Sequence, residues 1–148
     1  MNVEQVIKTD KKIPLKSRTI IHFKLVDTKI NETVTNTLKP YGVSLQQFNV
    51  LRILRGQNGK PANLSTLNER MVTKMSNTTR LVDKLLAKGY VHRKLCPSNR
   101  RKIEIRITDE GMAELAEMDK AMKAAEDEIL ARFSDKELEQ LNILFDKF

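Results

Sequence analysis

The sequence predicts a mainly α-helical single domain that carries one small β-hairpin. Apolar residues recur at helical spacing along most of the chain. One stretch, residues 102–107, instead alternates between polar and apolar side chains, which is typical of a half-buried strand. The length of 148 residues is enough for one core and short for two.

The first third of the chain contains two predicted helices. Apolar residues three and four positions apart from Leu15 to Leu38 indicate a long helix, and the segment Pro40–Gly42 ends it. Ser44 is a suitable N-cap for a second, shorter helix that stops by Gly56. We therefore expect a long helix followed by a short one, with a change of direction between them.

Two more short helices, joined by a tight turn, are predicted next. Thr66 and Glu69 fit a capping box, a hydroxyl residue followed three positions later by Glu, and indicate a helix through about Met71. The stretch 75–88 again has helical spacing, and Gly89 is well placed as its left-handed C-terminal residue.

A β-hairpin is predicted after Gly89. The segment 90–95 is the natural partner of 102–107, whose isoleucines would face inward. The turn formers Pro97, Ser98 and Asn99 would place Arg100 and Arg101 at or near the exposed tip.

The C-terminal part predicts two further helices. Thr108 is the expected N-cap of a long helix that runs towards Ala131. Ser134 and Glu137 form a second capping box, for a final helix that ends in the apolar segment 141–145.

Charge is unevenly distributed along the chain. Residues 1–69 hold 11 basic and 5 acidic side chains (+6), residues 70–106 hold 11 and 2 (+9), and residues 107–148 hold 5 and 12 (−7). A basic centre with an acidic end is expected if the centre meets phosphate groups and the end has another role.

Several classes of protein have no support in the residues. The single cysteine, Cys96, cannot form an intrachain disulfide, and the few His and Cys residues lack the spacing of a metal site. There is no phosphate-binding glycine loop and no nucleophile motif, so neither enzyme activity nor a cofactor is expected. No apolar run is long enough to cross a membrane or act as a signal peptide, so we expect a cytoplasmic protein.

The central motifs resemble those of a known family. The run LNERMVTKMSNTTRLVDKLLAKGYVHR (67–93) is similar to the recognition module of the MarR family of bacterial regulators, and PSNRRKIEIRITDEG (97–111) resembles that family's wing. The resemblance implies a winged helix-turn-helix, with the DNA-binding region at about 60–108 flanked by N- and C-terminal dimerisation helices at 1–40 and 109–148. It departs from the family at Asn99, where an Asp commonly precedes the paired arginines and could bind one of them.

DNA contacts are expected from the second short helix and from the wing. Arg80 could read guanine with its planar fork, Asn77 suits adenine, and the hydroxyl of Thr79 suits phosphate. By resemblance, a tip arginine would enter the minor groove. The full predicted set is Lys74, Ser76, Asn77, Thr79, Arg80, Lys84, Arg93, Asn99, Arg100 and Arg101. The alternatives are an ordinary amphipathic helix with a solvated face and, for part of the wing, cations that contact only water.

We expect the small winged module to leave apolar stripes of the terminal helices uncovered. A two-fold homodimer would bury them and space two recognition helices about one duplex turn apart, which implies an inverted-repeat site. The predicted dimerisation residues are Ile20, Phe133, Leu138, Leu141, Leu144 and Phe145. The alternative is a terminal helical hairpin that packs only within its own chain.

The resulting functional hypothesis is a homodimeric, sequence-specific regulator that binds double-stranded DNA, acts as a repressor and responds to a ligand. The resemblance implies a small aromatic or amphipathic effector in a crevice near Phe23 and Phe48. It also suggests that Cys96 acts as a redox switch; the alternative is a purely structural role for this residue. The alternative function is a winged-helix module for protein assembly, with the basic surface facing an acidic partner.

Overall fold

The computed structural model describes residues 1–72, 77–96 and 99–148, apart from the side chains of residues 96 and 99–102. In chain order the elements are α1 (Val3–Val6), α2 (Leu15–Leu38), the 3₁₀ turn η1 (Lys39–Tyr41), α3 (Leu45–Arg55), α4 (Leu64–Arg70), α5 (Thr78–Ala87), β1 (Val91–Cys96), β2 (Asn99–Ile107), α6 (Asp109–Leu130) and α7 (Asp135–Phe145). The fold class is the expected one, mainly helical with a single antiparallel hairpin.

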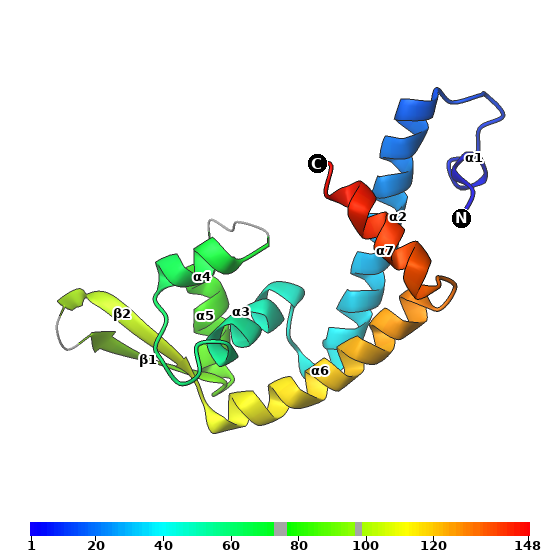
Figure 1. Ribbon diagram of the computed structural model, residues 1–148. Coiled ribbons are helices and arrows are strands. Elements are labelled where there is room, and N and C mark those ends of the chain that lie inside the picture. The colour runs from blue at the N-terminus through cyan, green and yellow to red at the C-terminus, as the bar shows by residue number, and fades with distance from the viewer. Residues whose placement is uncertain (73–76, 97–98) are drawn as a thin grey trace.

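The elements form two parts that α6 connects (Figure 1). Helices α3, α4 and α5 pack together with the hairpin at one end of the molecule. At the other end α7 lies beside the N-terminal half of α2, and the short α1 lies close to that half as well. Helix α6 begins at the base of the hairpin and runs to α7, so it spans both parts.

The main core lies where α3 meets α5, the hairpin and the first half of α6. Phe48, Leu51, Leu85, Ile105 and Leu115 are each at most 1% exposed. Helix α3 buries one face of its 11 residues, and its predicted N-cap, Ser44, forms a full capping box with Gln47. This core fixes the position of α5 and of the root of the hairpin.

The hairpin is joined by a short third segment that the sequence did not predict. Ala62 and Ile105 form an antiparallel bridge through hydrogen bonds of 2.9 and 2.7 Å between their backbone groups. The expected inward direction of Ile103, Ile105 and Ile107 is confirmed, since Ile105 is fully buried and the other two pack against the core.

The prediction of a capping box at Thr66 is wrong. The N-cap of α4 is Asn63, whose side chain accepts a hydrogen bond of 2.9 Å from the Thr66 backbone N–H. Glu69 instead accepts a hydrogen bond from the Ser65 hydroxyl, at 2.9 Å. The helix starts earlier than predicted because an Asx side chain caps as well as a hydroxyl does, and local spacing allowed both starts.

Most other predicted boundaries are confirmed. The long helix spans Leu15–Leu38, Thr108 caps α6, and Ser134 forms a capping box with Glu137. Of the predicted turn formers, Pro97 and Ser98 lie outside the described residues, whereas Asn99 is the first residue of β2 and pairs with Cys96. Helix α1 was not predicted. Glu4 of α1 accepts hydrogen bonds of 2.7 and 3.1 Å from the Arg18 guanidinium on α2.

Two glycines allow the hairpin to sit between α5 and α6. Gly89 has φ +75°, which is the left-handed conformation predicted for the end of α5. Gly111, in the first turn of α6, lies so close to the Tyr90 carbonyl that a Cβ atom would overlap it. The Thr108 hydroxyl donates a hydrogen bond of 2.7 Å to the Gly89 carbonyl, which ties the two turns together.

Candidate nucleic-acid interface

Helix α5 has one buried face and one exposed polar face. Thr78, Val82 and Leu85 are buried, and Leu81 packs at the edge of the core. The residues predicted to face outward are exposed: Asn77, Thr79, Arg80, Asp83 and Lys84. The helix thus presents a guanidinium, an ammonium, an amide and a hydroxyl group on one surface, which are the groups that bind phosphates and base edges.

The start of α5 is fixed to the preceding helix. The Thr78 hydroxyl donates a hydrogen bond to the Asn68 side chain on α4, and Thr78 is only 4% exposed. This bond between two side chains sets the relative position of the two helices of the helix-turn-helix. The Asn77 side chain makes no capping hydrogen bond to α5, and the residue is exposed.

Some of the predicted contact residues cannot be placed. Lys74 and Ser76 lie outside the described residues, and so do the side chains of Asn99, Arg100 and Arg101. Their predicted roles in DNA binding therefore stay predictions, as does the redox role of Cys96, whose side chain is also outside the description.

The basic residues of the hairpin differ from one another in their surroundings. Arg106 donates a hydrogen bond to the Gly59 carbonyl, and Lys94 stands opposite Glu104 in the strand register. Arg93, predicted to contact DNA, donates a hydrogen bond of 2.9 Å to Asp83 on α5. Among the described side chains of the wing, Arg93 and Arg106 therefore already have partners within the chain, which a count of charges along the sequence does not reveal.

Comparison with known proteins identifies the family. The family model described as MarR family matches residues 43–103, which cover α3, both helices of the helix-turn-helix and most of the hairpin. The HTH-type transcriptional regulator PecS of Dickeya dadantii is 30% identical over 122 residues, or 80% of this chain and 72% of PecS. The chain belongs to the MarR family of transcriptional regulators. The HTH-type transcriptional regulator MhqR of Bacillus subtilis is also similar, at 27% identity over 74% of each chain.

Solved structures confirm that the fold is that of MarR-family regulators. A MarR-like regulator from Bacillus cereus has a TM-score of 0.80 at 23% identity, over 90% of this chain and 96% of that one. A MarR variant from E. coli in complex with operator DNA has a TM-score of 0.76 at 22% identity, over 90% and 93% of the two chains. The MarR-family winged helix-turn-helix is therefore present, with its recognition helix at α5 and its wing at β1–β2.

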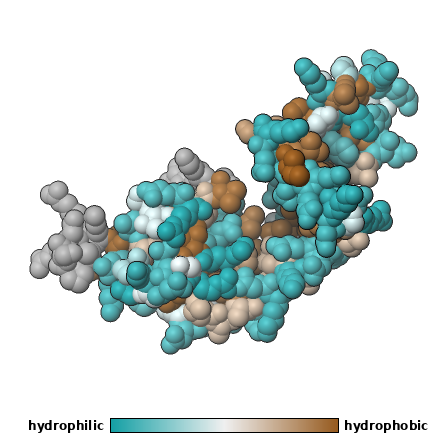
Figure 2. Space-filling view, viewed as in Figure 1, coloured by the Kyte–Doolittle hydropathy of each residue, from teal (hydrophilic) through white to brown (hydrophobic). Residues whose placement is uncertain are grey.

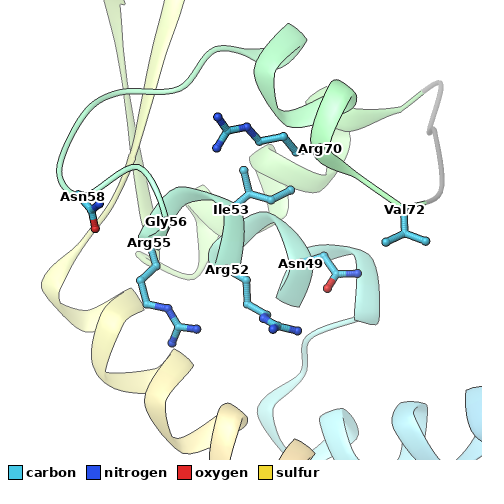
Figure 3. A pocket seen from close by; sticks show the side chains of 8 residues that line it. All are labelled: Asn49, Arg52, Ile53, Arg55, Gly56, Asn58, Arg70 and Val72. Atoms are coloured by element: carbon cyan, nitrogen blue, oxygen red, sulfur yellow. The ribbon is translucent and has the colours of Figure 1, made fainter. Parts of the chain in front are cut away.

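This MarR-family chain has an arginine-lined depression of about 580 Å³ on its winged module. Figure 3 shows Arg52 and Arg55 projecting from one side of α3, with Arg70 of α4 on the other side of Ile53. Val72, which is 94% exposed, completes the apolar part of the lining. Arg55 also pairs with Asp119 on α6, so one of the lining side chains contacts the helix that leads to the other end of the molecule.

The two aromatic residues expected near an effector do not share a site. Phe48 is 1% exposed within the core of the winged module. Phe23 lies near the far end of α2, where its ring centroid is 6.0 Å from that of Phe145 and 5.7 Å from that of Phe148. Phe48 is part of the buried core and Phe23 packs against the C-terminal aromatic residues, so the two do not line a common crevice.

The terminal helices of this MarR-family chain expose apolar side chains. Figure 2 shows apolar residues gathered at the end of the molecule that α2 and α7 form. Of the predicted dimerisation residues, Ile20, Phe133, Leu144 and Phe145 are 45–58% exposed, and Leu138 and Leu141 are half-buried. Helix α7 has no buried residue. No helix in the described part of the chain is long and apolar enough to cross a membrane.

Proposed function

We propose that this MarR-family chain is a homodimeric repressor that binds a pseudo-palindromic DNA operator and is released by a small organic effector. The observation that carries the proposal is the exposed row Asn77, Thr79, Arg80 and Lys84 on a helix whose other face is locked into the core. A rigidly held polar helix face can read bases, because each hydrogen bond then has a fixed direction.

The homodimer is supported by the exposed apolar end of the molecule. Leu144, Phe145 and Phe148 are 53, 49 and 92% exposed, and an apolar surface of this kind is stabilised when a second copy covers it. Two α5 helices about 34 Å apart would then meet successive turns of the major groove.

The effector is supported by the depression on the winged module. A volume of about 580 Å³ lies in the range of small-molecule sites, and its lining combines Ile53 and Val72 with three arginines. An aromatic or amphipathic compound with an acidic group fits these features, since arginine binds carboxylates through two parallel hydrogen bonds.

The test begins with selection of genomic DNA fragments by the purified protein and sequencing of what is retained. We expect one enriched motif with inverted-repeat symmetry. Binding of that duplex is then compared between Arg80→Ala and Arg132→Ala, which remove the same charge from α5 and from the loop after α6. Arg80→Ala should weaken binding by about 10- to 100-fold and relax the preference at one base pair, because a bidentate contact is worth roughly 1–3 kcal/mol.

Two results would contradict the proposal. Recovery of fragments without a common motif would exclude sequence-specific binding. Retention of full, selective binding by Arg80→Ala would exclude α5 as the reading element. Phosphate-dominated binding should also weaken steeply with salt, with a log-log slope near −0.9 for each neutralised phosphate, whereas a protein-assembly module has no such dependence on duplex DNA.

A further inference from the structure

The two faces of the hairpin present different residues. In an antiparallel pair, residues directly opposite each other point to the same side, and sides alternate along each strand. Arg93 stands opposite Ile105, which is fully buried, and Val91 stands opposite Ile107. Arg93 therefore lies on the side of the hairpin that faces the core and α5.

Arg93 is also at the level where the hairpin leaves the core. Val91, two residues earlier on the same side, is 3% exposed, whereas Leu95, two residues later, is 64% exposed. Ile105, opposite Arg93, is the residue that bridges to Ala62. Core packing thus weakens beyond Arg93, where Ile103 is only partly buried against the core and Leu95 is exposed, so a further contact at this level helps to fix the direction of the wing.

Asp83 supplies that contact from the recognition helix. Its carboxylate accepts a hydrogen bond of 2.9 Å from the Arg93 guanidinium, and the two side chains are 52% and 40% exposed. Among the side-chain hydrogen bonds of the described residues, this is the one that joins α5 to the hairpin. The pair lies on the surface and still has access to solvent, so both groups are solvated and screened.

The charge of Asp83 is unusual for its position. It lies one turn from Arg80 and next to Lys84 on the exposed face proposed to meet DNA, where an unpaired carboxylate would repel phosphates. Pairing with Arg93 compensates that charge. An acid at this place is therefore best explained by the contact it makes with the hairpin.

We propose that Asp83 and Arg93 are positioning residues that hold the wing at a fixed angle to the recognition helix, so that both engage DNA at once. The inference rests on the proposed DNA-binding function. It replaces the expected role of Arg93 as a direct phosphate contact. It also implies that removal of a negative charge from the DNA-facing surface weakens specific binding.

The experiment uses the full-length protein and the duplex obtained by fragment selection. Dissociation constants are measured for Asp83→Asn, Arg93→Gln and the double variant, against that duplex and against an unrelated duplex at the same salt concentration. Glu126→Gln, on the exposed surface of α6, is the control that makes the same change of charge as Asp83→Asn outside the winged module. Thermal unfolding of each variant checks that the fold is retained, and hydroxyl-radical footprinting locates the contacts that are lost.

We expect Asp83→Asn and Arg93→Gln each to weaken binding of the selected duplex by about 5-fold, the upper range for an exposed ion pair. Because both variants remove the same contact, the double variant should be no weaker than the weaker single one. Affinity of Asp83→Asn for the unrelated duplex should be unchanged or higher, since one negative charge is gone. Protection of the flanking backbone should fall while central protection remains. Asp83→Glu, which keeps the carboxylate, should retain binding to within about 2-fold.

The inference is overturned if Asp83→Asn binds the selected duplex as tightly as the wild type, or more tightly. It is also overturned if the two single variants are additive and Arg93→Gln lowers the salt slope by about 0.9, because Arg93 would then be a phosphate contact. These outcomes differ from failure of the proposed function. In that case the wild-type protein itself would select no motif, and Arg80→Ala would bind DNA no differently from it.

Discussion

Arg55 on α3 pairs with Asp119 on α6, and this ion pair joins the winged module to the helix that runs to the opposite end of the molecule. The Tyr41 hydroxyl makes a second link nearby, a hydrogen bond of 3.4 Å to the Glu117 carbonyl of α6. Arg55 also lines the proposed effector site. An anionic ligand in that site would compete with Asp119 for the same guanidinium.

This competition predicts a gain in ligand affinity when Asp119 is neutralised. Asp119→Asn should bind benzoate about 2- to 5-fold more tightly than the wild type, because Arg55 is then free to bind the carboxylate. Isothermal titration calorimetry measures the affinity. The control is Asp127→Asn, the same substitution further along α6, which should leave it unchanged. Unchanged or weaker binding by Asp119→Asn would contradict the competition between ligand and carboxylate.

Gly111→Ala should destabilise the protein. Its new methyl group would overlap the Tyr90 carbonyl, so the hairpin root and α6 must move apart, at a cost of about 1–3 kcal/mol. Chemical denaturation measures the loss. Gly56→Ala, at the end of α3 with φ −64°, should have an effect near zero, since the nearest atom to its methyl group is at 3.4 Å. Similar unfolding free energies for both variants would show that this close approach has no energetic importance.

Leu144→Asp should weaken dimerisation and spare the monomer. Leu144 is 53% exposed, so a charge there is tolerated in the separate chain but not in a dry interface. We expect the dimer dissociation constant to rise by about 30-fold or more, the effect of a central interface residue. Sedimentation equilibrium measures it. Met112→Asp, at an exposed apolar position on the first half of α6, should leave the dimer intact. A dimer that is insensitive to Leu144→Asp would place the interface elsewhere.

The cap of α7 predicts a dependence of stability on pH. The Ser134 backbone N–H and hydroxyl both donate hydrogen bonds of 2.8 Å to Glu137, and they hold the pKa of this carboxyl below its ordinary value. Since the folded pKa is the lower one, the stabilisation is present above the ordinary carboxyl pKa and is lost as pH falls through the folded value. The Tm difference between the wild type and Glu137→Gln should therefore be larger at pH 7 than at pH 3. Equal differences at the two pH values would contradict this.

Local sequence signals were sufficient for most of the helical fold. Proline and glycine ended α2, Thr108 and Ser134 began the last two helices, and Gly89 ended α5, because each of these signals acts within one turn of the chain. They failed at Asn63, because two possible caps, Asn63 and Thr66, lie three residues apart and only packing could select one.

The candidate site was also predictable only in part, because local signals do not show which elements pack together. Helical spacing alone predicts that Thr79, Arg80 and Lys84 share the exposed face of α5. The side of the hairpin on which Arg93 lies could have been inferred from strand alternation, since Arg93 stands two residues after the apolar Val91. The partner of Arg93 could not have been inferred from the sequence, because Asp83 belongs to another element and a pairing between elements depends on how they pack.

The sequence by itself determined the order of the elements from α2 onward, the exposed polar face of α5 and the division between a basic centre and an acidic C-terminal segment. These properties depend on spacing and charge along the chain. Only the tertiary structure decided which cations of the described residues already have a partner within the chain. Nothing in the local sequence shows the partners of Arg93, Arg106 and Arg55. Each of these arginines donates a hydrogen bond to an acceptor that lies 10 to 64 residues away along the chain. Such contacts arise because packing of the core brings distant segments within hydrogen-bonding distance.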